Sequence, residues 1–255
     1  MFVQNINPDL IIIGPLSIRF YGIVYALGFL LVAYILSKKS NKIKNLDKDK
    51  AFDIVIYGMF FGLIGARIFH VISDFHLYQN NLLGVFAIWN GGLGFQGGLI
   101  GALIAVYFYC KKHSINMFKV LDTVVVPLPL ILAFGRIANF INSEHLGFVT
   151  NVPWCVIFQK VDNLCRHPAQ LYQALSQLFL FIVLVFLSKR KWSKKTGTLT
   201  WSFITGYGFI RLVTDFFRSD LTKLFLGLSH TQIINLIMIV IGVYYLYRIN
   251  QSSKK

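Results

Sequence analysis

Apolar residues run through this chain in long stretches that are interrupted by short polar and lysine-rich segments. A helix needs about 20 mostly apolar residues to cross the hydrocarbon of a bilayer. The pattern therefore predicts an all-α membrane protein with seven transmembrane helices, and we expect residues 1–255 to form a single polytopic membrane domain. The predicted spans lie near residues 18–36, 52–73, 91–110, 120–141, 172–188, 198–217 and 231–248.

Composition supports a membrane protein and argues against a soluble domain. Hydrophobic residues make up 56% of the chain and charged residues only 14%, whereas soluble domains carry roughly 25% charged residues. Cys110 falls within a span, and three scattered cysteines fit no metal-site spacing. We expect no metal and no other cofactor.

The formal net charge of +15 could indicate a nucleic-acid partner, but the distribution of the basic residues favours a membrane. Of the 25 lysines and arginines, 17 fall on one side if the spans alternate, which is the positive-inside pattern. We therefore expect an outer N-terminus, a cytoplasmic C-terminus and no nucleic acid. These residues are Lys38, Lys39, Lys42, Lys44, Lys48, Lys50, Lys111, Lys112, Lys119, Lys189, Arg190, Lys191, Lys194, Lys195, Arg248, Lys254 and Lys255.

The longest hydrophilic segment runs from about residue 143 to 170 and is predicted to lie on the outer side. Loops of this length are often functional when they are ordered. Cys155 and Cys165 both lie in it, so a disulfide between them is possible on that oxidising side.

A polar decapeptide directly precedes this loop and is fused to the apolar stretch 124–134. Residues 135–144 read GRIANFINSE and include Glu144, the single glutamate of the chain. Ionisable groups at bilayer depth cost at least ~2.5 kcal/mol each, so they are interpreted as functional by default. We give Arg136, Asn139 and Glu144 more weight as a site than as a purely structural group.

Arginines inside or at the edge of the spans are candidates for an anion site, because a guanidinium binds phosphate through a two-pronged fork. The spacing of Tyr207, Arg211, Asp215 and Arg218 places them on one helix face, and Arg136 and Asn139 share a face of another span. In a membrane, the expected anion is a phospholipid head group. The candidate arginines are Arg19, Arg67, Arg136, Arg211 and Arg218.

Structural alternatives remain for some of these residues. Arg67 could form an ion pair with Asp53 or Asp122. Interfacial anchors are the alternative for Arg218, Lys223, Tyr21 and Tyr25. Six glycines between residues 91 and 101 include a formal GxGxxG, but no soluble βαβ unit surrounds it. Small residues spaced four apart there predict close helix packing in lipid.

The residues around the decapeptide resemble a known family. Gly135-Arg136-x-x-Asn139-Phe140-Ile141-Asn142-x-Glu144-x-x-Gly147 resembles the signature of the prolipoprotein diacylglyceryl transferases, and four further stretches agree in order. The resemblance covers nearly the whole chain. The four stretches are residues 18–22 (IRFYG), 65–67 (GAR), 166–172 (RHPAQLY) and 207–218 (YGFIRLVTDFFR).

The resemblance implies an enzyme of the bacterial cytoplasmic (inner) membrane. Such an enzyme moves the diacylglyceryl group of phosphatidylglycerol to the lipobox cysteine of a prolipoprotein and releases glycerol phosphate. Arg136 and Arg211 would then hold the phosphate, Asn139 would bind the head group, and Glu144 would orient an arginine. The implied site residues are Tyr21, Arg136, Asn139, Glu144, Gly147, Tyr207 and Arg211, with Gln96 among the substrate-binding positions.

Two positions depart from the family pattern. A histidine that is proposed to activate the thiol is replaced by Gln96, which cannot take up a proton, and Asp215 stands where the family commonly has a glutamate. His145 is another candidate base, although a lone histidine at a loop edge is more often a bystander.

Two other kinds of function compete with a transferase. An anion or head-group transporter would also need polar residues inside its bundle, although the chain shows no half-to-half repeat. An intramembrane protease is less favoured, because the sequence contains no GxSxG, HExxH or Gly-x-Gly-Asp motif.

Overall fold

The computed structural model of the chain describes residues 2–13, 16–79, 81–87 and 91–251. These residues are mostly helical and form two compact units. One unit comprises the residues up to Gly28 and those from Leu121 onward, and the other comprises Phe29–Val120.

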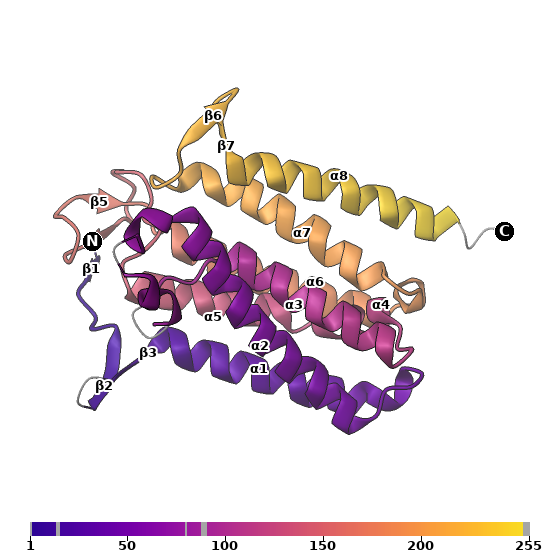
Figure 1. The fold of residues 1–255 in the computed structure, drawn as a ribbon. Coiled ribbons are helices and arrows are strands. Elements are labelled where there is room, and N and C mark those ends of the chain that lie inside the picture. Colours follow the sequence, from indigo (N-terminus) through magenta and orange to yellow (C-terminus); the bar gives the residue numbers. More distant parts are fainter. Residues whose placement is uncertain (1, 14–15, 80, 88–90, 252–255) are drawn as a thin grey trace. The chain divides into compact units, whose positions relative to one another are not determined.

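The first unit is a bundle in which helices that follow one another in sequence pack side by side (Figure 1). It contains the start of α1 (Phe20–Lys39) and the end of α4 (Met117–Val124). Its other helices are α5 (Leu128–Ile141), α6 (Ala169–Ser188), α7 (Thr198–Thr214) and α8 (His230–Gln251), with short 3-10 turns at Trp192–Lys194 and Asp215–Phe217.

The second unit is built on α2 (Lys48–Ser73) and α3 (Phe95–Lys112), which pack through glycines. A Cβ at Gly65 would overlap the backbone carbonyl of Gly97, and one at Gly101 would overlap that of Phe61. The small-residue packing predicted for the glycine-rich stretch is therefore confirmed. Its 3-10 turns are Ser40–Lys42, Phe75–Leu77 and Leu82–Phe86.

Gly65→Ala is expected to destabilise the protein, by about 1–3 kcal/mol for an overpacked contact. The matched change Gly58→Ala on the same helix places its methyl 3.6 Å from Val106, an ordinary contact, so it should be neutral or slightly stabilising. Thermal unfolding of both variants in detergent tests this. Equal melting temperatures would contradict the close packing of α2 on α3.

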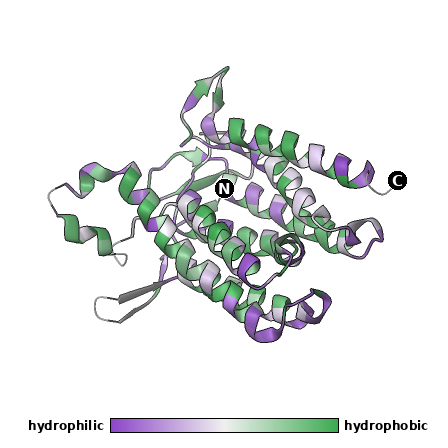
Figure 2. Cartoon of the chain, turned by 45° about the vertical axis from the view of Figure 1, so that its right-hand side comes forward, coloured by the Kyte–Doolittle hydropathy of each residue, from purple (hydrophilic) through white to green (hydrophobic). Residues whose placement is uncertain are grey.

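Four helices are long and apolar enough to cross a membrane, namely Phe20–Lys42, Lys48–Ser73, Ala169–Ser188 and His230–Gln251. Green residues dominate these helices in Figure 2. The expected span 120–141 is instead a bent pair, α4 and α5, with an angle of 49°. Pro127 and Pro129 lie at this break, and proline has no N–H to continue the helical ladder.

The other two expected spans correspond to α3 and α7, which do not meet the same length and hydropathy criteria among the described residues. Helix α7 has 17 residues, and α3 has 18 that end in two lysines. The fold is that of a multi-pass membrane protein, and the count of seven spans stays a prediction.

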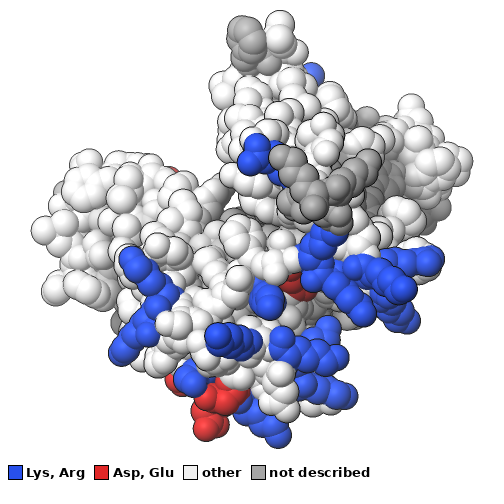
Figure 3. Space-filling model, turned by 90° about the vertical axis from the view of Figure 1, so that its right-hand side faces the viewer, with Lys and Arg blue, Asp and Glu red and all other residues white. Residues whose placement is uncertain are grey.

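Basic side chains gather at helix ends (Figure 3). In the first unit, the lysines of residues 189–195 follow the end of α6 and precede α7, and Lys195 reaches the backbone of Ile249 near the end of α8. In the second unit, α1 ends in Lys38 and Lys39, and α3 ends in Lys111 and Lys112.

The chain is mostly helical, as predicted, but it is not all-α, because short strands form before α1 and between later helices. Strands β1 (Phe2–Gln4), β4 (Val156–Phe158) and β5 (Cys165–Arg166) form one sheet, with β1 parallel to β4 and β4 antiparallel to β5. Two hairpins pair β2 (Asp9–Ile13) with β3 (Leu16–Arg19) and β6 (Lys223–Phe225) with β7 (Leu228–Ser229). Each pairing satisfies backbone groups of connecting segments.

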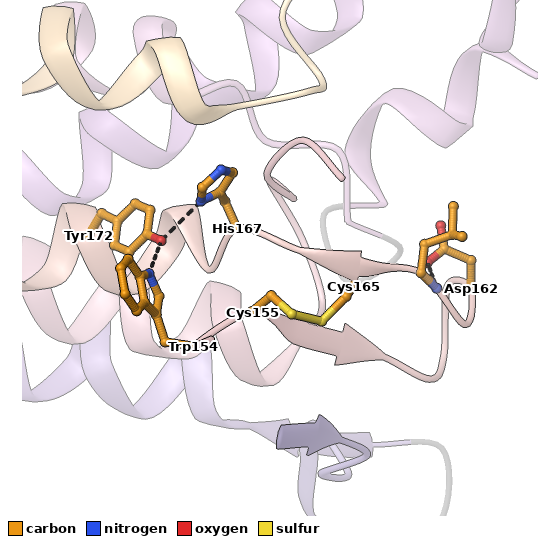
Figure 4. Close-up of a disulfide and its surroundings, with 7 residues drawn as sticks. Trp154, Cys155, Asp162, Cys165, His167 and Tyr172 are labelled. Carbon is orange, nitrogen blue, oxygen red and sulfur yellow. Dashed lines mark hydrogen bonds between the residues drawn. A yellow bond between two sulfur atoms is a disulfide. The ribbon is translucent and has the colours of Figure 1, made fainter. Parts of the chain in front are cut away.

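The loop between α5 and α6 is covalently closed. Cys155 and Cys165 form a disulfide across β4 and β5, as Figure 4 shows. In the same view, the hydroxyl of Tyr172 accepts a hydrogen bond from Trp154 and contacts His167, which ties the loop to the first turn of α6. The sequence left undecided whether Cys155 and Cys165 pair, and in the structure they do.

The N-terminal strand fixes the end of the decapeptide. Gln4 is fully buried; its amide donates to the carbonyl of Ile141 (2.9 Å), and its side-chain oxygen accepts from Ser143 (2.9 Å). The backbone of Ser143 has a φ of 58°, a turn conformation that a buried partner helps to hold. Strand β1 thus positions the turn that carries Glu144.

Candidate active site

The end of α7 carries a buried pair of opposite charges. Arg211 Nη2 lies 3.2 Å from Asp215 Oδ1, and the side chains are 9% and 0% exposed. Asp215 also accepts hydrogen bonds from Gln173 (3.3 Å) and Thr231 (3.1 Å). Arg211 lies in the last turn of its helix, where the helix dipole favours a cation. The carboxylate is thus fully engaged and holds Arg211 in place.

One guanidinium nitrogen of Arg211 makes no hydrogen bond within the described residues. Nη1 is buried and has no hydrogen-bond partner among the described residues. A buried donor without a partner costs about 1–3 kcal/mol, and more when it is charged. This nitrogen is therefore a natural contact for an anionic ligand.

The sequence placed Arg218 on one helix face with Arg211 and Asp215, but its main partner in the structure is Asp220. Its Nη1 lies 3.6 Å from Asp215, but its Nε and Nη2 donate to the two oxygens of Asp220 at 2.9 and 2.6 Å. His145 Nδ1 also lies 2.9 Å from Asp220. Burial alone would raise the pKa of Asp220, but the hydrogen bonds from His145 and Arg218 outweigh it and hold that pKa well below its usual range. Arg218 is therefore neutralised in a network of the loop.

Asn139 connects the decapeptide to α1. It is buried; its Oδ1 accepts from Arg136 (3.1 Å), and its Nδ2 donates to Glu144 (2.8 Å) and to the hydroxyl of Tyr21 (3.3 Å). Glu144 also accepts from Asn142 (3.3 Å). In the described structure, Asn139 thus links Glu144 to Arg136, and the expectation that Glu144 orients an arginine stays a prediction.

The two polar clusters lie within electrostatic range of each other. Arg211 interacts electrostatically with Arg136 and with Tyr207, and Tyr25 interacts with Tyr21, Arg136 and Tyr207. The rings of Tyr21 and Tyr25 are 5.1 Å apart. These residues come from α1, α5 and α7, so the helices bring side chains that are far apart in sequence into one polar site.

The charges of this site are unevenly distributed. Three carboxylates, Asp215, Asp220 and Glu144, match in number the three arginines Arg136, Arg211 and Arg218. No described carboxylate lies within ion-pair distance of Arg136, however, and Arg211 keeps one nitrogen without a partner. Arg136 and Arg211 thus each keep guanidinium hydrogen-bond donors that no described carboxylate satisfies.

Comparison with known proteins agrees with this geometry. Residues 8–248 match the family model described as prolipoprotein diacylglyceryl transferase. The chain belongs to the prolipoprotein diacylglyceryl transferase family. A relative from Vibrio parahaemolyticus, named phosphatidylglycerol–prolipoprotein diacylglyceryl transferase, is 36% identical over 245 residues, which cover 94% of this chain and 89% of the relative.

Relatives from other bacteria carry the same name. One from Bartonella bacilliformis is 36% identical over 266 residues, covering 97% of this chain and 93% of the relative. One from Brucella anthropi is 33% identical over 268 residues, covering 98% and 94%. Similarity to the transferase family therefore extends over both compact units.

Of the residues assigned from the family signature, six lie in the site described above, namely Tyr21, Arg136, Asn139, Glu144, Tyr207 and Arg211. Gly147 has a structural reason to be glycine, because a Cβ there would overlap the backbone carbonyl of His167. Its own carbonyl accepts from Arg166 (3.2 Å), and its backbone bridges to Arg218. Gln96 lies in the first turn of α3, in the other unit, and is exposed.

Besides Arg218, two of the five candidate arginines have partners outside the site. Arg19 is the last residue of β3; its side chain is 61% exposed and pairs with Asp9. Arg67 is buried, and its nitrogens donate to five backbone carbonyls, those of Gly84, Val85, Ala87, Gly91 and Gly92. These contacts give Arg67 a structural role. The suggested ion pair with Asp53 or Asp122 is wrong, because Asp53 accepts a hydrogen bond from Tyr109 and Asp122 accepts hydrogen bonds from the start of α7.

The sequence analysis did not single out three buried glutamines of α6, the helix that packs against α5 and α7; they are Gln170, Gln173 and Gln177. Gln170 donates to the backbone carbonyl of Glu144, and Gln173 donates to Asp215. The signal was available, because glutamines at spacings of three and four form a polar stripe along an otherwise apolar helix.

Proposed function

We propose that this chain transfers the diacylglyceryl group of phosphatidylglycerol to the cysteine thiol of a prolipoprotein and releases glycerol phosphate. The observation that carries the proposal is the pair of available guanidinium groups, Arg136 without a carboxylate and Arg211 with its unpartnered Nη1. The printed names of the relatives support the same donor and acceptor.

The reaction places its electrostatic demand on the leaving group. The thiolate sulfur attacks the glyceryl carbon that bears the phosphate; a C–S bond forms, the C–O bond breaks, and the phosphate oxygen leaves with the electron pair. Preorganised donors aimed at such developing charge contribute about 3–4 kcal/mol each in a site without water. Arg136 and Arg211 supply these donors, and Asp215 and Asn139 hold them in position.

The other site residues have supporting roles. Asn139 joins Arg136 to Glu144 and to the Tyr21 hydroxyl, so it sets the distance between α1 and α5. Tyr207 lies one helical turn from Arg211 and contributes a hydroxyl to the same site. Gly147 allows the loop to pack closely, and Gln96 is proposed as a contact of the lipid.

A dedicated base for the thiol is not required. A thiol with a pKa near 8.5 needs roughly 2 kcal/mol to ionise at pH 7, which is less than the demand at the leaving phosphate. The proton passes to solvent before the attack. His145 is held by Arg218 and Asp220, which fits a structural role.

Gln96→Ala is accordingly expected to keep measurable transfer, whereas Arg136→Ala is expected to lose it. Initial rates in purified, reconstituted protein measure both. The opposite ranking would show that the position of the family histidine still limits the reaction and would contradict our assignment.

We also propose that the segment from residue 143 to 170 lies outside the bacterial inner membrane, with seven spans in total and a cytoplasmic C-terminus. The disulfide in this segment and the lysines at the opposite end of α6 support that orientation. Labelling of single introduced cysteines from either side of intact cells tests the orientation.

The proposed activity is tested by incubating the purified protein with phosphatidylglycerol and a peptide that contains a lipobox cysteine. The peptide should gain the mass of one diacylglyceryl group without being cut. Uptake of labelled anion into proteoliposomes with no lipidated peptide would instead favour the transporter.

A further inference from the structure

Three glutamines form one buried face of α6 beside the site. Gln170, Gln173 and Gln177 are 0%, 1% and 2% exposed and follow one another at spacings of three and four residues. Helix α6 packs against both α5 and α7, the helices that carry Arg136 and Arg211. Buried glutamine is uncommon unless its polar atoms are paired, so this face calls for a partner.

The side-chain oxygens of these glutamines have no hydrogen-bond partner among the described residues. The Oε1 atoms of Gln170, Gln173 and Gln177 are all buried and without a hydrogen-bond partner among the residues the structure describes. The orientation of two amides is fixed by chemistry. Gln173 faces the Asp215 carboxylate and Gln170 faces the Glu144 carbonyl, and both of these groups only accept, so the NH₂ must point to them and the oxygen away.

The unpartnered atoms of the site therefore include both a hydrogen-bond donor and hydrogen-bond acceptors. Arg211 Nη1 is an unpartnered donor, and the glutamine oxygens are unpartnered acceptors. Asp215 joins the two groups, since it binds both Arg211 and Gln173. A ligand that satisfies all of them carries an anionic group next to hydrogen-bond donors.

We propose that the carbonyl oxygens of Gln173 and Gln177 accept hydrogen bonds from the free hydroxyls of the phosphatidylglycerol head group. This inference rests on the proposed function and adds the residues that select a glycerol-bearing lipid. Gln170, which is tied to Glu144, extends the same face toward the loop. The phosphate is held by arginines and the polyol by glutamines.

The test compares two donors that differ only in these hydroxyls. Phosphatidylpropanol has the same phosphate and acyl chains as phosphatidylglycerol but no free head-group hydroxyl. Wild-type protein should prefer phosphatidylglycerol in kcat/KM by at least about tenfold, the scale of two neutral hydrogen bonds. Gln177→Met and Gln173→Met should each lower the ratio by about threefold, and the two changes together should bring it close to one, mainly by lowering the rate with phosphatidylglycerol.

The exposed Gln159 lies in the loop, so Gln159→Met is the matched control and should keep the wild-type ratio. A wild-type ratio of one, or an unchanged ratio in both α6 variants, would overturn the inference. So would an equal loss with both donors, which indicates a purely structural role. A raised KM for the peptide with an unchanged donor ratio would assign the glutamines to the peptide and also overturn it.

These outcomes differ from failure of the proposed function. If wild-type protein transfers nothing from either lipid, the transferase proposal itself fails, and the selectivity inference fails with it. If wild-type protein transfers from both lipids equally, the transferase stands and only the role of the glutamines is rejected.

Discussion

Arg211→Ala is expected to lower the rate of diacylglyceryl transfer by about 100- to 1,000-fold, the usual effect of removing one preorganised donor. The change removes the unpartnered Nη1 and leaves Asp215 with Arg218 at 3.6 Å as its remaining cation. Phosphate binding then depends on Arg136 alone. Steady-state rates with phosphatidylglycerol and a lipobox peptide, in protein that elutes as the wild type does, provide the measurement.

Arg211→Lys separates charge from geometry. Lysine keeps the positive charge but cannot bind Asp215 and a phosphate through one planar fork, so we expect its rate to lie between those of wild type and Arg211→Ala. Arg190 is exposed at the other end of α6, where it stacks on Phe186, and Arg190→Ala should behave as wild type. A normally folded Arg211→Ala with wild-type turnover would refute the phosphate assignment.

Asn139→Leu is expected to be the second most damaging change. Leucine has a similar volume but removes the contacts to Arg136, Glu144 and Tyr21 together. The Arg136 guanidinium loses the partner that orients it, and misplaced catalytic groups commonly cost about 100-fold in rate. Turnover should therefore fall by that order, and the melting temperature should fall as well because Glu144 loses its shorter hydrogen bond.

Asn142→Leu is the matched control, because Asn142 also donates to Glu144 but has no hydrogen bond with Arg136 in the described structure. If Glu144 acted on the substrate directly, both variants would lose similar activity. If Glu144 acts through Asn139, as we infer, only Asn139→Leu should lose most of its turnover. Parallel rates and melting curves for the two variants distinguish these cases.

Much of the site could be predicted because its parts lie close together in sequence. Arg136, Asn139 and Glu144 belong to one decapeptide, and the spacing of Arg211 and Asp215 places them on one helix face. Arg218 shares that spacing, yet it binds Asp220 because the helix ends at Thr214 and the chain turns away. Periodicity cannot anticipate where a helix stops.

The sequence by itself determined that the chain is a membrane protein, which segments are apolar, and which family it belongs to, because these properties depend on composition and local order. Only the tertiary structure decided that Arg67 is enclosed by backbone carbonyls, that Gln4 fixes the turn before Glu144, and that Gln173 binds the carboxylate that holds Arg211. Such partners are chosen by the packing of distant segments. A pattern of residue types along the chain does not encode which of many possible partners each buried polar group meets.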